Sequence, residues 1–269
     1  MMRQATLGRA VEVGGIGLRS GAPCAVWLRP AAPDAGVRFQ VEGHDVPVHV
    51  ANVVDSTLAT VLGRSGVRVA LVEHLLAAVL ACRIDNLTVE VGGDEVPILD
   101  GAALGWLGAL SRAGRRVQDR PAHTWTVREP IHVSAGNSEA TLYPAAELEL
   151  DISVDFDHPA IGLQRWVGRP LSSFGSELAW ARTFGFHRDA ERLQALGIVQ
   201  GASLDNTLVY GDNAPMNPAG VRREDEVVRH KALDALGDLA LLPGRPCVRL
   251  VARRGGHALH HALLRAACA

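Results

Sequence analysis

The stretch DEVVRHKALDALGDLALL, residues 225–242, decides how the chain is organised. Its apolar residues recur every three or four positions, which predicts a long helix with one buried face. His230 and Asp234 are four residues apart, so they lie one turn apart on the same face. Asp238 follows one turn later. The spacing suits two ligands of one metal ion, although taken alone it fits a solvated helical ion pair better.

The same stretch contains Lys231, the only lysine among 27 lysine and arginine residues. Arginine supplies positive charge everywhere else, so this position is a candidate for a compact point charge that a planar guanidinium cannot replace. Chance survival of a lysine on a helix surface is the competing interpretation.

A second apolar helix is predicted over residues 72–82, VEHLLAAVLAC. Burying a charged Glu73 in such a helix costs several kcal/mol unless it is paired, which favours a position facing a cleft. A histidine ligand, His74, beside a glutamate that acts as general base is a common arrangement in metallohydrolases. An acidic residue that complements the helix dipole explains Glu73 equally well.

Two further segments carry candidate polar groups. Gly255 and Gly256 free the backbone before His257, a candidate acid or electrostatic group. The neighbouring His260 and His261 are expected on the surface. Residues 181–186, ARTFGF, offer a threonine hydroxyl that could donate to an oxyanion and two phenylalanines that could line an apolar slot.

The remaining pattern predicts two α+β halves. Strands are expected at residues 24–29, 36–41 and 86–91, with a helix at 103–113, before a polar stretch at 113–121 that we interpret as a linker. The second half is expected to hold strands at 124–133, 140–143, 148–154 and 247–252, and helices at 172–181, 188–196 and 257–266. Because the order of elements is similar, we predict two related domains with a site in the cleft between them.

Bulk composition narrows the class of protein. Hydrophobic residues make up 48% of the 269 residues, and the net charge of −2 gives no reason to expect a nucleic-acid partner. No secretory signal and no run long enough to span a membrane is visible, so we expect a cytoplasmic protein, with a monomer favoured. The four cysteines form no C-x-x-C pair, so a transition metal here must use histidine and carboxylate ligands.

Taken together, the motifs resemble the UDP-3-O-acyl-N-acetylglucosamine deacetylase family, the zinc enzymes of lipid A biosynthesis. The most specific combination is H-K-x-L-D-x-x-G-D at residues 230–238, V-E-H-L at 72–75 and R-T-F-G-F at 182–186. Weaker matches in family order span nearly the whole chain: residues 6–7, 15–18, 28–30, 85–86, 96–101, 155–159, 201–206, 225–226, 229 and 256–259. The resemblance implies two α+β domains, residues 1–119 and 120–269, each a β-sheet layered with α-helices, with the active site between them.

The resemblance also assigns roles to residues of this chain. It implies Zn²⁺ bound by three ligands: His74, His230 and Asp234. Glu73 would deprotonate the zinc-bound water, and Thr183 would stabilise the oxyanion of the attacked acetamide.

A positively charged His257, oriented by Asp238, would be the general acid. The remaining residues would contact the small-molecule substrate, an acylated UDP-amino sugar: Lys231 near the phosphates, Phe156 near the uracil, Arg254 near the diphosphate, and Phe184 and Phe186 beside the acyl chain.

Three positions depart from the family pattern, namely Arg19, Leu71 and Ala102, where histidine, threonine and serine are usual. They leave the implied metal ligands and proton-transfer groups intact but bear on the substrate. The leading hypothesis is hydrolysis of the N-acetyl group of UDP-3-O-acyl-N-acetylglucosamine. A paralogous zinc deacetylase for another N-acetylated amino sugar, and a non-catalytic sugar-nucleotide binding protein, are the alternatives.

Overall fold

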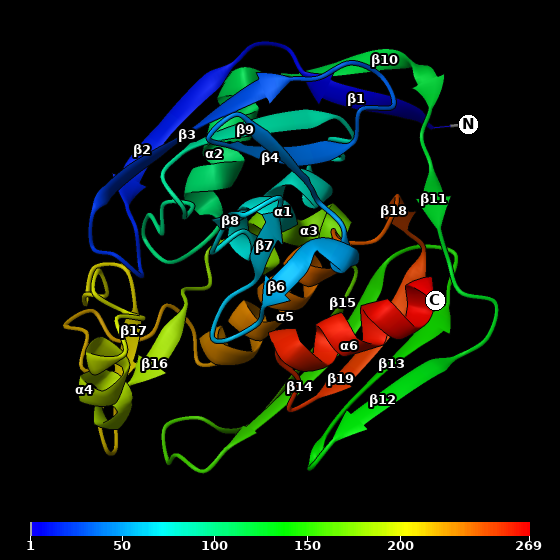
Figure 1. Ribbon diagram of the computed structural model, residues 1–269. Coiled ribbons are helices and arrows are strands. Elements are labelled where there is room, and N and C mark those ends of the chain that lie inside the picture. The colour runs from blue at the N-terminus through cyan, green and yellow to red at the C-terminus, as the bar shows by residue number, and fades with distance from the viewer. Residues whose placement is uncertain (1) are drawn as a thin grey trace.

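Two five-stranded sheets enclose most of the helices in the computed structural model, which describes residues 2–269 (Figure 1). The first sheet has the order β2 (Val11–Ile16), β3 (Pro23–Pro30), β9 (Leu87–Gly92), β4 (Val37–Val41) and β5 (His44–Pro47). The second has the order β12 (Ile131–Ala135), β13 (Ser138–Pro144), β19 (Val248–Arg253), β14 (Glu149–Phe156) and β15 (Gly162–Gly168).

The two sheets have the same design. In each, the central strand pairs antiparallel with one neighbour and parallel with the other, β9 with β4 and β19 with β14, and the remaining pairs are antiparallel. The α+β class and the repeated arrangement predicted from the sequence are therefore confirmed. The boundary between residues 119 and 120 stays a prediction.

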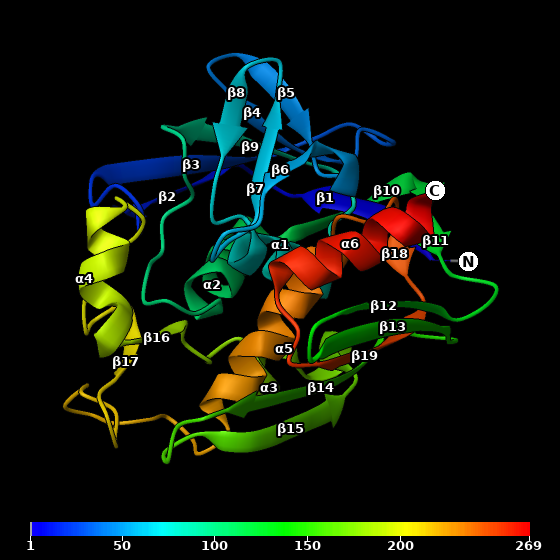
Figure 2. The same ribbon diagram turned by 60° about the horizontal axis from the view of Figure 1, so that its bottom comes forward.

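The helices fill the space between the sheets in both ribbon views (Figures 1 and 2). They are α1 (Glu73–Ala81), α2 (Leu104–Ala113), α3 (Pro170–Glu177), α5 (Glu226–Leu239) and α6 (His257–Cys268). Helix α4 (His187–Ala195) lies outside this layer, with no buried residue of its own. Helices α1 and α5 are almost wholly buried, so polar side chains on them are buried as well.

Smaller sheets complete the fold. They are β1 (Arg3–Leu7) with β10 (Arg115–Pro121), β11 (Thr124–Trp125) with β18 (Arg245–Pro246), β16 (Phe184–Phe186) with β17 (Leu208–Tyr210), and β6 (Val53–Asp55), β7 (Val61–Arg64) and β8 (Val67–Val69). A 3₁₀ turn, η1 (Val50–Asn52), precedes β6. Among residues 2–269, no helix has both the length and the apolar character that crossing a membrane requires.

Two local predictions are wrong. The stretch interpreted as a linker is strand β10, which pairs antiparallel with β1. This strand lacks the alternation of buried apolar and exposed polar residues that indicates a strand in a sequence. Its one buried side chain is Gln118, whose amide group is hydrogen-bonded to Asn86 and to the carbonyl of Ala31. The single strand expected over residues 124–133 is two strands, β11 and β12, in different sheets.

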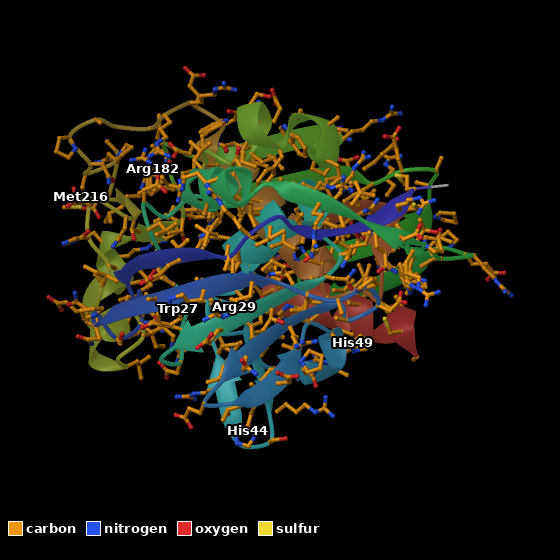
Figure 3. All side chains as sticks on the ribbon, turned by 90° about the horizontal axis from the view of Figure 1, so that it is seen from above. Trp27, Arg29, His44, His49, Arg182 and Met216 are labelled. Atoms are coloured by element: carbon orange, nitrogen blue, oxygen red, sulfur yellow. The ribbon has the colours of Figure 1, made fainter. Side chains whose placement is uncertain are left out.

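In the view from above the first sheet, labelled residues mark two opposite ends of the molecule (Figure 3). Trp27 and Arg29 mark β3, and His44 lies at the far tip of the β4–β5 hairpin with His49 nearer the middle. Arg182, the first residue of the R-T-F-G-F motif, lies at the opposite end.

Candidate metal centre and active site

Helices α1 and α5 touch backbone to backbone where the candidate ligands lie. A Cβ atom added at Gly237 of α5 would lie 2.2 Å from the carbonyl oxygen of Glu73, at the start of α1. Only glycine permits so close an approach, because any side chain would have to displace backbone. The contact sets His74 of α1 against the ligand-bearing turn of α5.

Three predicted metal ligands converge at this crossing. One donor atom each of His74, His230 and Asp234 lies within 4.8 Å of the others. The Nε2 atoms of His74 and His230 are 3.6 and 3.3 Å from Oδ1 of Asp234. Ligand atoms held tetrahedrally about 2.0–2.1 Å from Zn²⁺ are roughly 3.3 Å apart, so these distances fit such an ion.

The hydrogen bonds of His230 leave one nitrogen free for a metal. Its Nδ1 donates to the carbonyl oxygen of Ala181 at 3.1 Å, which places the lone pair on Nε2, the atom that faces Asp234. Burial lowers the pKa of His230 to about 4, against the opposing effect of Asp234, so the ring is neutral at pH 7. A neutral imidazole is the form that binds metal.

Asp234 stays ionised although it is buried. Burial would raise its pKa, but the charges of His230, which is protonated in acid, and of Lys231 hold the pKa well below its usual range. Lys231 donates from Nζ to Oδ2 of Asp234 at 2.8 Å. Asp234 in turn raises the pKa of Lys231 against the effect of burial, so the ammonium stays charged at the site.

Glu73 lies beside this cluster, with 3% of its surface exposed. The backbone N–H of Thr60 donates to its Oε2 at 3.0 Å. Its Oε1 lies 3.8 Å from Nε2 of His257. Burial raises the pKa of Glu73, although His257 and His74 oppose the shift, and a raised pKa makes its carboxylate a better proton acceptor.

His257, the first residue of α6, is bound by Asp238. Its Nδ1 lies 3.0 and 2.9 Å from the two carboxylate oxygens, to which it donates. Burial alone would lower the pKa of His257, but Asp238 and, less strongly, Glu73 and Asp234 raise it to about 9. The imidazolium is therefore the stable form at pH 7, as a proton donor requires.

The expectation that His260 and His261 lie on the surface is wrong. Their exposed fractions are 3% and 0%, and both rings contact the carboxylate of Asp238. A lone sequence offers no signal for this, because histidine is common on exposed helix faces and the partner is 22 and 23 residues away. Thr60, which bonds Glu73 and Asp238, carries no sequence signal either, since it lies in a loop without a motif.

A buried ion pair fixes the R-T-F-G-F segment against α5. The guanidinium of Arg182 donates twice to the carboxylate of Glu226, at 2.8 and 3.0 Å, and both side chains are buried. The N–H of Thr183 donates to the carbonyl of Gly101 at 2.7 Å. At the start of the same segment, the carbonyl of Ala181 accepts a hydrogen bond from His230, so the segment is tied to a candidate metal ligand.

The three predicted substrate aromatics form one group. Ring centroids of Phe156 lie 5.5 Å from Phe184 and 5.7 Å from Phe186, and Phe184 packs edge-on to His230 at 6.2 Å. A cavity of about 60 Å³ lies beside Phe186, lined also by His158, Arg188 and Tyr210. The group therefore extends from the candidate metal ligand His230 to the end of strand β14 in the second sheet.

Arg254 follows β19 and forms an ion pair with Asp155, the residue before Phe156. The side chain is 44% exposed, so its cation is open to solvent beside the aromatic group. A far larger cavity, of about 680 Å³, lies elsewhere, between the first sheet and the C-terminal end of α5. It is lined by none of the predicted site residues, and the polar side chains Gln4, Asn86 and Arg245 there are hydrogen-bonded to protein groups.

The three family departures lie in different settings. Leu71, just before α1, has a left-handed backbone with a φ of 62°, a conformation that costs about 1–3 kcal/mol for a residue other than glycine. Ala102 is fully buried. The side chain of Arg19 is 29% exposed and lies 4.0 Å from Asp55, which leaves its guanidinium partly free.

Comparison with known proteins identifies the family of the chain. The family described as "LpxC: UDP-3-O-acyl N-acetylglycosamine deacetylase" matches residues 4–269. Relatives from three organisms illustrate the similarity, and each bears the name UDP-3-O-acyl-N-acetylglucosamine deacetylase. The one from Syntrophotalea carbinolica is 41% identical, over 98% of this chain and 87% of its own. Those from Myxococcus xanthus and Brucella melitensis biotype 2 are each 42% identical, over 97% and 98% of this chain and 85% and 94% of their own. The chain therefore belongs to the family of UDP-3-O-acyl N-acetylglycosamine deacetylases.

Proposed function

We propose that this protein hydrolyses the N-acetyl group of UDP-3-O-acyl-N-acetylglucosamine, a step of lipid A biosynthesis, with Zn²⁺ bound by His74, His230 and Asp234. The observation that carries the proposal is the convergence of a three-ligand cluster with a buried carboxylate and a buried imidazolium in a member of this deacetylase family. Family membership supports the reaction, and the cluster supports the metal. The cytoplasmic location and the monomeric state remain predictions.

Two histidines and one carboxylate suit Zn²⁺ with one coordination position open, as in catalytic zinc sites. When bound, the ion would supply Lewis-acid polarisation of the amide carbonyl and would lower the pKa of water to about 7. The protein's own part in binding is to hold His230 in one tautomer through Ala181 and to keep Asp234 ionised through Lys231.

Glu73 is the general base and His257 the general acid of the proposed reaction. The Glu73 carboxylate accepts a proton from the attacking water, whose oxygen forms a bond to the acetyl carbon. His257 donates its Nε2 proton to the nitrogen of the breaking C–N bond, so acetate and a free amine leave. The 3.8 Å between Glu73 Oε1 and His257 Nε2 supports a shared reaction centre.

Thr183 donates its hydroxyl to the developing oxyanion, a contact typically worth roughly 3 kcal/mol. Lys231 and Arg254 offer cations to the diphosphate. Phe156 stacks near the uracil, while Phe184 and Phe186 border the acyl chain. The aromatic group that these three phenylalanines form supports one continuous substrate surface beside the metal ligands.

The decisive experiment incubates the purified zinc-loaded protein with UDP-3-O-acyl-N-acetylglucosamine and measures free acetate. A panel of other N-acetylated amino sugars separates the paralogue alternative, because a better substrate in the panel would replace the proposed one. Binding of the sugar nucleotide without acetate release would favour the non-catalytic alternative.

A further inference from the structure

Asp238 is the meeting point of an unusually dense group of donors. Its carboxylate is 1% exposed, and three histidines of α6 surround it. Nδ1 of His257 lies 2.9 Å from Oδ2, and Nδ1 of His260 lies 2.8 Å from the same oxygen. Nε2 of His261 lies 3.1 Å from Oδ1, to which the hydroxyl of Thr60 donates at 2.8 Å.

The proton positions follow from the chemistry of the acceptor. An ionised carboxylate only accepts hydrogen bonds, so each ring nitrogen that faces it carries a hydrogen. His261 then presents a bare Nδ1, which accepts from the hydroxyl of Ser56 at 2.7 Å. Each polar atom of His261 thus has a partner, and the ring is fixed from both sides.

Only one ring nitrogen of His260 forms a hydrogen bond. Its Nδ1 donates to Asp238, but Nε2 is buried and has no hydrogen-bond partner among the described residues. Burying such an atom unpaired costs about 1–3 kcal/mol, which an apolar residue of similar size would avoid. Gly255 makes room for the ring, because a Cβ there would lie 2.8 Å from Nε2. The contact with Asp238 is what offsets this cost.

Donors on both oxygens prevent the carboxylate from turning about its own axis. With Oδ1 fixed by His261 and Thr60, and Oδ2 by His260, Asp238 presents a fixed edge to His257. That edge directs the opposite nitrogen of His257, Nε2, to within 3.8 Å of Glu73 and 3.9 Å of Asp234. We propose that His260 and His261 are positioning residues, which act through Asp238 to hold His257 in the orientation that proton transfer requires. The inference rests on the proposed function.

The two rings use different nitrogens, which gives a sharp test. Asparagine places its amide nitrogen near the Nδ1 position of histidine, and glutamine places it near Nε2. At position 260, His260→Asn keeps the donor to Asp238 and His260→Gln moves it away. At position 261 the order is reversed: His261→Gln keeps the donor and His261→Asn loses it. All four variants are polar and similar in size, so each pair controls for loss of the aromatic ring.

We expect kcat for acetate release to fall roughly tenfold to a hundredfold in His260→Gln and His261→Asn, with KM unchanged, since displacements of about 1 Å can have effects of this size. The matched variants His260→Asn and His261→Gln should stay within a few-fold of the unmodified protein. Adding His260→Gln to a His257→Ala protein should change kcat by less than about twofold, because residues that act through one another are not additive.

The inference would be overturned if the same amide, asparagine or glutamine, were the more active replacement at both positions. A change in KM instead of kcat would overturn it as well. Nitrogen-15 NMR of the histidine rings provides a readout that needs no activity. The Nδ1 resonance of His257 should move in His260→Gln and His261→Asn but not in the matched variants. If the unmodified protein releases no acetate, the proposed function fails, and unmoved NMR resonances would then separately refute the positioning role.

Discussion

Replacing Gly237 by alanine tests whether the contact between α1 and α5 builds the site. In an open helix this change stabilises the folded state by up to about 1 kcal/mol, because alanine is the better helix former. Here the new Cβ would lie 2.2 Å from the carbonyl oxygen of Glu73 and 2.8 Å from its carbonyl carbon. Reaching the 3.4 Å at which ordinary van der Waals contact begins requires the two backbones to separate by about 1.2 Å.

The obstacle is backbone at the first turn of a buried helix, so no flexible side chain can absorb the shift. Overpacking of this kind destabilises a core by typically 1–3 kcal/mol. The separation also moves His74 away from His230 and Asp234, which come from the other helix. Since a misplacement near 1 Å can lower a rate a hundredfold, we expect a loss of that order in kcat/KM together with weaker zinc binding.

Urea denaturation, zinc titration and acetate release on Gly237→Ala measure these three effects. The matched control is Gly108→Ala in α2, where the nearest atom to an added Cβ is the flexible end of Arg112 at 3.6 Å. The control should be as stable as the unmodified protein or more so, with full activity. A Gly237→Ala protein that equals the control in stability and zinc affinity would refute the claimed contact.

Further predictions concern single groups of the site. Glu73→Gln should lower kcat by about 10²–10⁴-fold while zinc stays bound, as metal analysis of the variant would establish; undiminished turnover would remove Glu73 as the base. Glu226→Gln leaves the buried guanidinium of Arg182 without its charge partner and should destabilise the fold by about 3–5 kcal/mol. Urea denaturation measures this effect, and an unchanged midpoint would contradict the importance of the ion pair. The pKa of His257, ordinarily 6.5, is raised to about 9 by Asp238 against the effect of burial, so its contribution to stability is full below pH 6.5 and is lost as the pH rises through about 9. In the metal-free protein this loss is on the order of 3 kcal/mol and should largely disappear in Asp238→Asn; equal pH slopes in urea denaturation of the two proteins would contradict it.

Helical periodicity predicts part of the arrangement in which His74, His230 and Asp234 converge, and the family resemblance predicts the rest. The spacing of His230 and Asp234 places them on one face of a helix. The apolar run after His74 predicts that the helix carrying this histidine is buried. Their meeting depends on Gly237, whose role is visible only when α1 crosses α5. Family motifs, rather than spacing, linked the two helices before the structure did.

The polar surroundings of the site were beyond prediction from the residues. The sequence predicts His260 and His261 on the surface, and this prediction is wrong because burial of a histidine depends on partners that are distant in sequence. The same holds for Gln118, a buried polar residue in a strand whose exposed neighbours resemble a linker. In each case a hydrogen-bonded partner overrides the simple rule that polar residues face water.

The most direct test of the account is a titration of Zn²⁺ into metal-free protein while acetate release from UDP-3-O-acyl-N-acetylglucosamine is recorded. We predict that activity rises from near zero to a plateau at one equivalent of zinc, and that His74→Ala protein does not respond at one equivalent. Full acetate release before any zinc is added, or no release at any zinc concentration, would contradict the central claim.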